Sequence, residues 1–210
     1  MRFHPIPPAD FVPSLARRWL VALALLTGGL WLPPVLAAAS AEEAALLAAL
    51  QGPGHVLLMR HADAPGTGDP ANMRLGDCST QRNLSAGGRR QAAAAGDLLR
   101  AAGIRQAEVQ SSQWCRCLDT ARLLGLGETQ PLPLLNSFFS RTTEGKAQTI
   151  ALQRWLAKRK AGLPLILVTH QVNITELTGI YPETGELIVL QLPDSDTVRV
   201  LGRIRTGAGS

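Results

Sequence analysis

The chain has 210 residues, of which 46% are hydrophobic and 18% are charged, and its formal net charge at pH 7 is +5. The basic residues are scattered apart from one cluster at 158–160, and the chain has a single Tyr that could stack on a base. Both features argue against a nucleic-acid surface. We therefore expect no nucleic-acid partner.

Residues 1–39 have the composition of a secretory signal peptide. Arg17 and Arg18 precede an apolar run at 20–32, which two prolines end, and small residues follow at 37–40. A basic flank, a short apolar core and a small-residue cleavage site occur in this order in signal peptides. The run is short for a membrane span, which needs about 20 residues. We expect cleavage, export to the periplasm or beyond, and no stable membrane span afterwards; an uncleaved N-terminal anchor is the alternative.

Removal of this segment leaves residues 40–210, which are enough for one domain with a single core. The segment carries three Arg and one Asp, so its loss lowers the formal charge from +5 to +3. A mildly basic domain of this kind suits an anionic substrate.

The rest of the chain alternates between predicted helices and strands. In chain order the elements are a helix at 41–51, a buried strand at 56–59, a helix at 85–102, a strand at 108–111, a helix at 115–124, a helix ending near 160, a buried strand at 165–169, a helix from 173, and strands at 187–192 and 198–204. Ser85 is placed to cap the second helix, and Ser111 or Ser112 the third. The pattern predicts a single three-layer α/β domain, with a mostly parallel sheet, helices on both faces and a C-terminal edge hairpin.

Three cysteines follow the predicted signal peptide: Cys78, Cys115 and Cys117. In an oxidising compartment this number predicts one disulfide and one free thiol. Cys115 and Cys117 are too close in sequence to pair comfortably on a helix, so we expect Cys78 to pair with one of them. A C-x-C pair with one distant Cys lacks a fourth ligand, and we expect no metal site.

Two of the most apolar strands end in histidine. The run "LLMRH" ends at His61 and "LILVTH" ends at His170. Ligands of open α/β sheets bind beyond the carboxyl ends of the strands, so these two imidazoles could meet at one pocket. Arg116 falls in the first turn of a predicted helix, where free N–H groups already attract anions and a guanidinium adds a bidentate clamp. With Arg60, these residues predict an anion pocket that suits a phosphoryl group.

The segments "LMRHADAP", "LSAGGRRQA", "SSQWCRCLDTA" and "LVTHQVNI" resemble, in this order, motifs of the histidine phosphatase superfamily, also called phosphoglycerate mutase-like. The resemblance covers residues 55–178. It implies a phosphohistidine mechanism, in which His61 attacks phosphorus as the neutral imidazole. Arg60 and Arg116 would neutralise the phosphoryl oxygens, and His170 would add a fourth donor. No metal or other cofactor is implied.

The chain departs from the family pattern at three positions. Ala62 and Gln171 stand where many members have Gly, and in the phytase branch the position of Gln171 carries Asp. Asn136 occupies the segment in which many relatives carry a general-acid Glu. We expect Glu144 to be the general acid, because it lies on the loop most suited to cover the pocket. The other candidates for this role are Asp63, Asp77 and Glu176.

The sequence thus favours an exported phosphomonoesterase that acts on a small phosphorylated substrate. Arg82, Asn83 and Gln171 are candidate substrate contacts. Some exported relatives look like lipopolysaccharide-core heptose phosphatases, which makes an envelope sugar phosphate the favoured substrate. The alternatives are a phosphotransferase or mutase, and a phosphate-ligand binding module without catalysis on the same fold.

Overall fold

The computed structural model describes residues 1, 41–160, 162–192 and 198–206. Apart from Met1, the predicted signal peptide lies outside the described residues. Within the described ranges, no helix is both long enough and apolar enough to cross a membrane.

The described residues form a mostly parallel sheet of six strands. They are β1 (His55–Arg60), β2 (Glu108–Ser111), β3 (Thr129–Pro131), β4 (Leu165–Thr169), β5 (Leu187–Gln191) and β6 (Arg199–Ile204). Their order in the sheet is β3-β2-β4-β1-β5-β6. The first four of these are parallel, whereas β5 and β6 pair antiparallel as a hairpin at one edge. The predicted fold class and edge hairpin are confirmed.

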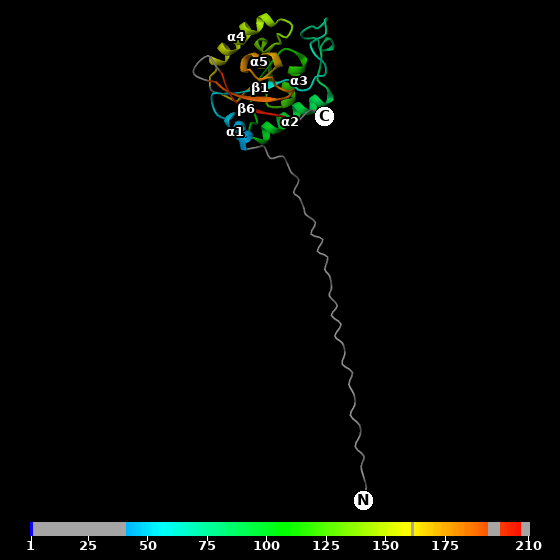
Figure 1. The fold of residues 1–210 in the computed structure, drawn as a ribbon, viewed down its shortest axis with the longest axis vertical. Coiled ribbons are helices and arrows are strands. Elements are labelled where there is room, and N and C mark those ends of the chain that lie inside the picture. The colour runs from blue at the N-terminus through cyan, green and yellow to red at the C-terminus, as the bar shows by residue number, and fades with distance from the viewer. Residues whose placement is uncertain (2–40, 161, 193–197, 207–210) are drawn as a thin grey trace. The chain divides into compact units, whose positions relative to one another are not determined.

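Helices cover both faces of the sheet (Figure 1). They are α1 (Ala41–Ala49), α2 (Ala86–Ala101), α3 (Cys115–Leu124), α4 (Gly145–Ala157) and α5 (Gln171–Thr178). Leu57 and Met59 pack in a core with α1, α2 and α3, while Val56 and Leu58 pack in a second core with α4 and α5. Because successive side chains of a strand point to opposite faces, a strand covered on both sides is apolar throughout.

The structure confirms Ser85 as the cap of α2. The Ser85 hydroxyl accepts a hydrogen bond from the Gly88 N–H (2.8 Å) and donates one to the Asp63 carboxylate (2.6 Å). Gly88 itself is pressed against the backbone, because a Cβ there would lie 2.0 Å from the Asp63 carbonyl oxygen. The start of α2 is thereby fixed against the segment that directly follows His61.

The expected cap of α3 is wrong. Ser111 is the last residue of β2. The Ser112 hydroxyl lies 2.8 Å from Nε2 of His170 and accepts from the Trp114 N–H (3.4 Å), but no N–H of the first helical turn donates to it. Trp114 is the N-cap residue and its side chain makes no capping bond. The Cys115 N–H instead donates to the side-chain oxygen of Gln81 (3.0 Å), so a distant loop caps this helix.

Two further boundaries differ from the prediction. α5 begins directly after His170 rather than at 173, and β3 forms at 129–131, where no strand was expected. β3 has three residues, one of them Pro, and lies at the edge of the sheet, so it carries no apolar alternation that would reveal it.

Candidate active site

The register of two neighbouring strands brings the two histidines together. Arg60 of β1 is paired with Thr169 of β4 in parallel, so His61 and His170 leave the sheet side by side. The His61 N–H donates to the Thr169 carbonyl (2.9 Å), and the two imidazole centroids are 5.5 Å apart. Both side chains are buried. The carboxyl ends of β1 and β4 therefore place both rings at one cavity.

The hydrogen bonds of His61 fix its tautomer. Nδ1 lies 2.8 Å from the Ala62 carbonyl oxygen, which can only accept, so Nδ1 carries the proton. Nε2 is then unprotonated, and its lone pair accepts a hydrogen bond from the Arg116 Nε–H (3.3 Å). Burial, with a further contribution from the Arg116 charge, lowers the pKa of His61 to about 3. The ring is therefore neutral at physiological pH, with a nucleophilic nitrogen facing the cavity.

Arg116 presents two edges of its guanidinium to different partners. Nε and Nη2 face the histidines, with Nη2 3.4 Å from His170 Nδ1. Nη1 and Nη2 face the Asp69 carboxylate, at 2.5 Å and 3.3 Å. A guanidinium can clamp an oxyanion with two parallel N–H bonds. The edge between the histidines is placed to hold a phosphoryl group while Asp69 holds the other edge.

The hydrogen bonds and the burial of His170 favour its neutral form. Its Nδ1 accepts from Arg116, so Nε2 carries the proton and donates to the Ser112 hydroxyl (2.8 Å). That hydroxyl can donate in turn to Asn136 Oδ1, 3.3 Å away. Burial, followed by the neighbouring His61 and Arg116, lowers the pKa of His170 well below its usual value. A bound anion would favour its protonated form, which can donate to a phosphoryl oxygen.

The cavity has a volume of about 140 Å³ and is lined by three guanidinium groups, those of Arg60, Arg82 and Arg116. Carbonyl oxygens hold two of them, since Arg60 donates to Pro182 (2.8 Å) and Arg82 donates to Gly68 (2.9 Å). Burial lowers the pKa of Arg60 and of Arg82, but a guanidinium stays charged in proteins. The predicted contacts Arg82 and Gln171 both line this cavity.

The structure does not bring Glu144 to the cavity. Glu144 precedes α4 and forms an ion pair with Arg141 (3.2 Å), and both side chains are more than half exposed. Its place at the start of α4 therefore directs it to the surface. Asn83 also lies outside the lining, because its amide donates to the Cys78 carbonyl (2.7 Å). The other candidate acids, Asp63, Asp77 and Glu176, are likewise not among the lining residues.

Asn136, which stands in the segment where the resemblance led us to expect a general-acid Glu, has a structural place. Its Oδ1 accepts from the backbone N–H of Gln113 (2.9 Å), and its Nδ2 donates to the Gln113 side chain (2.8 Å). These bonds hold the segment between β2 and α3, on which Ser112 contacts His170. Asn136 therefore supports the second histidine instead of supplying a proton.

Asp69 is the site residue that the sequence did not reveal. Its carboxylate accepts from Arg116 and from the indole N–H of Trp114 (3.0 Å). Among the described residues that line the cavity, it is the only carboxylic acid. Asp69 lies in an irregular loop, 47 residues before Arg116, so no local pattern indicates the contact.

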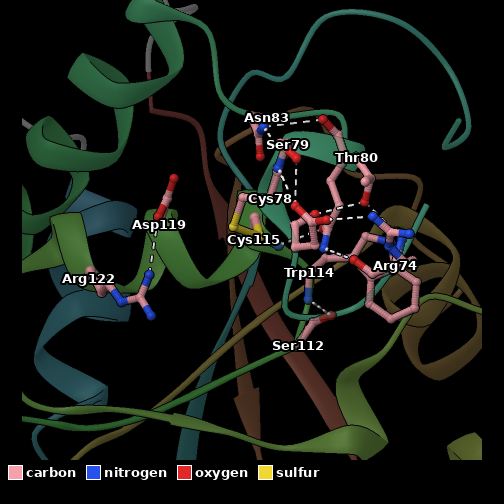
Figure 2. Close-up of a disulfide and its surroundings, with 12 residues drawn as sticks. Arg74, Cys78, Ser79, Thr80, Asn83, Ser112, Trp114, Cys115, Asp119 and Arg122 are labelled. Atoms are coloured by element: carbon pink, nitrogen blue, oxygen red, sulfur yellow. Dashed lines mark hydrogen bonds and ion pairs between the residues drawn. A yellow bond between two sulfur atoms is a disulfide. The ribbon is translucent and has the colours of Figure 1, made fainter. Parts of the chain in front are cut away.

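A disulfide ties the loop that carries Asp69 and Arg82 to the first turn of α3 (Figure 2). It joins Cys78 to Cys115, which are 37 residues apart. Cys117 is free and buried, with its sulfur 3.5 Å from His170 Nε2. Burial raises the pKa of the Cys117 thiol to about 12, so it stays protonated. Within the part of the chain that the structure describes, no group of acidic, His and Cys side chains could hold a metal ion.

Comparisons with known proteins agree with this geometry. The model of the histidine phosphatase superfamily, branch 1, matches residues 56–161. No curated protein sequence matches the chain.

Several solved structures share the fold. A phosphoserine phosphatase from Entamoeba histolytica, solved with 3-phosphoglyceric acid, is 13% identical, with 72% of this chain and 97% of that chain covered and a TM-score of 0.53. The Rv3214 protein of Mycobacterium tuberculosis is 16% identical, with 76% and 100% covered and a TM-score of 0.52. The SixA protein of Agrobacterium tumefaciens is 21% identical, with 74% and 100% covered and a TM-score of 0.51. The family match over half of the chain shows that it belongs to the histidine phosphatase superfamily, branch 1.

Proposed function

We propose that the protein is an exported phosphomonoesterase that works through a phosphohistidine intermediate on His61. One observation carries the proposal. A neutral imidazole, with Nδ1 bound to the Ala62 carbonyl, turns its unprotonated nitrogen towards Arg116 in a cavity lined by three guanidinium groups. An activated nucleophile beside preorganised positive charge is what phosphoryl transfer requires.

The reaction has two steps. In the first, the lone pair of His61 Nε2 forms a bond to phosphorus, the ester P–O bond breaks, and the alcohol leaves with a proton. In the second, a water oxygen bonds to phosphorus and the P–N bond breaks. Inorganic phosphate leaves, and the proton given up by water restores the proton donor. Arg60, Arg82 and Arg116 neutralise the phosphoryl oxygens throughout, so these residues need no metal to balance the charge.

The cavity mouth supports a sugar phosphate as the substrate. Phe139 and Tyr181 line the same cavity and are 52% and 70% exposed. Exposed aromatic rings beside a polar site offer flat apolar surfaces, on which the C–H face of a sugar ring can stack. Together with the predicted signal peptide, this favours an envelope sugar phosphate, such as a lipopolysaccharide-core heptose phosphate.

The decisive experiment measures the hydrolysis of p-nitrophenyl phosphate by the purified protein with and without a chelator. We expect turnover that the chelator does not change and that His61→Ala abolishes. His55→Ala is a matched control, because His55 begins the same strand and does not line the cavity. Acid-labile phosphate should become attached to the wild type but not to His61→Ala.

The products separate the remaining possibilities. Release of inorganic phosphate supports the phosphatase, whereas an isomerised phosphate ester would indicate a mutase. Turnover by His61→Ala at the wild-type rate would refute the proposal. A screen of sugar, nucleotide and inositol phosphates then tests the substrate, and faster turnover of nucleotides than of sugar phosphates would count against an envelope sugar.

A further inference from the structure

Cleavage of an alkyl phosphate needs a proton for the leaving oxygen, and the expected donor, Glu144, lies at the surface. The described lining of the cavity offers a single carboxyl group, that of Asp69. Its side chain is 21% exposed and lies against Arg116, which is buried. It can therefore reach both a bound phosphate ester and the solvent.

The position of Asp69 is compatible with a bound phosphoryl group. The carboxylate takes the Nη1 and Nη2 edge of Arg116, while the Nε and Nη2 edge faces the two histidines. A phosphoryl group on the inner edge would share Nη2 with Asp69. The carboxyl group would then lie next to the phosphate ester without displacing it from Arg116.

We propose that Asp69 is the general acid that protonates the leaving oxygen, and the general base that activates water in the second step. This role rests on the proposed phosphatase function. In the first step the carboxyl proton passes to the ester oxygen as the P–O bond breaks. In the second step the carboxylate takes a proton from the attacking water as the P–N bond breaks. One proton leaves Asp69 and one returns in each turnover.

The surroundings of Asp69 explain how substrate binding would protonate its carboxylate. Burial raises the pKa of Asp69, but hydrogen bonds from Arg116 and Trp114 outweigh burial and hold that pKa below its usual value. A bound phosphoryl dianion competes for the charge of Arg116 and adds negative charge, and both effects favour the protonated carboxyl. A phosphate monoester has a second pKa of about 6, so its monoanion can bring the proton.

Asp69→Asn tests the proposal with two substrates that differ in their leaving groups. p-Nitrophenolate leaves without a proton, whereas the glycerol of glycerol phosphate needs one. We expect Asp69→Asn to lower kcat/KM for glycerol phosphate by about 100- to 10,000-fold, a typical loss for a general acid. For p-nitrophenyl phosphate the first step should be nearly unchanged, as measured by the burst of p-nitrophenol.

A purely structural role for Asp69 predicts a different result. If Asp69 only positioned Arg116, Asp69→Asn would slow the first step of both substrates by the same factor, and that outcome would overturn the proposal. Unchanged glycerol phosphate turnover would overturn it as well. Asp69→Glu, which keeps a carboxyl group, should recover part of the glycerol phosphate activity and serves as the second variant.

Asp77→Asn is the matched control. Asp77 lies in the same loop but bonds to Ser79 and Arg74 outside the cavity, so neither substrate should be affected. Failure of the phosphatase function itself looks different, because wild-type protein would then turn over neither substrate, or would do so equally well after His61→Ala.

Discussion

Removal of the Cys78–Cys115 disulfide should cost the protein about 4 kcal/mol of stability. The bond closes a segment of 37 residues. In the chain-entropy model a loop of this size restricts the unfolded chain by about 13 cal/mol/K, which is about 4 kcal/mol at 25 °C. For a domain of this size, a loss of 4 kcal/mol corresponds to a decrease in Tm of roughly 10 °C.

The same change should weaken the active site, because the bond fastens to α3 the loop that carries Asp69 and Arg82. Gln81, which caps α3, also lies in it, and Arg116 follows Cys115 directly. Without the bond, the loop can move away from α3 while the histidines stay fixed by β1 and β4. We therefore expect kcat/KM to fall by a larger factor than the folded fraction, mainly because KM rises.

The variant is Cys78→Ser combined with Cys115→Ser, which leaves no partner for Cys117. Urea unfolding measures stability, and p-nitrophenyl phosphate hydrolysis measures activity, each with and without reductant. Wild-type protein should lose stability in reductant, and the double variant should not respond. Cys117→Ala is the control for the response to reductant, because that thiol is free and the variant should lose stability in reductant as wild-type protein does. Equal stability of the double variant and the oxidised wild type would refute the reasoning.

Two further predictions concern His61 and Gly88. The pKa of His61 is about 3 in the folded protein and 6.5 when unperturbed. The neutral form of His61 therefore contributes fully to the stability of the protein above about pH 6.5. This contribution is lost as the pH falls towards 3, by on the order of 1 kcal/mol per pH unit. Urea unfolding across this range should show that the free energy of unfolding falls less steeply with decreasing pH in His61→Gln than in wild type. The same pH dependence in both proteins would contradict the lowered pKa of His61. Gly88→Ala should destabilise the protein by about 1–3 kcal/mol and lower kcat/KM, since the added Cβ would lie 2.0 Å from the Asp63 carbonyl oxygen. Gly162→Ala, with nothing within 4 Å, should change neither quantity in the same assays, and similar effects of both variants would exclude the close contact as the cause.

The fold was predictable because its strongest signals are local. The apolar runs that become β1 and β4 are covered on both faces, and a run of that kind needs no knowledge of its partners. The meeting of His61 and His170 followed from the general rule about the carboxyl ends of parallel strands. The register of Arg60 with Thr169 then sets the two residues side by side.

The parts that sequence missed depend on contacts across loops. The cap of α3 comes from Gln81, 34 residues before Cys115, and Asp69 reaches Arg116 from an irregular segment. Neither contact leaves a periodic pattern.

The choice between Cys115 and Cys117 depends on which side of α3 faces the loop. Residues two apart on a helix point about 200° from each other, so only one cysteine can face Cys78 while the other faces the core.

The charges of the residues that line the cavity indicate how many charges its ligand should carry. Three guanidinium groups and the Asp69 carboxylate leave two positive charges, because His61 and His170 are neutral. An entering phosphoryl dianion cancels these two charges before Asp69 or His170 takes up a proton, and burial of a charged group is costly unless it is compensated. Beyond these three guanidinium groups, the described lining of the cavity offers no further cation for a second phosphate or a carboxylate. The cavity should therefore favour a monophosphate of a neutral alcohol over a bisphosphate, as the proposed monoesterase function requires.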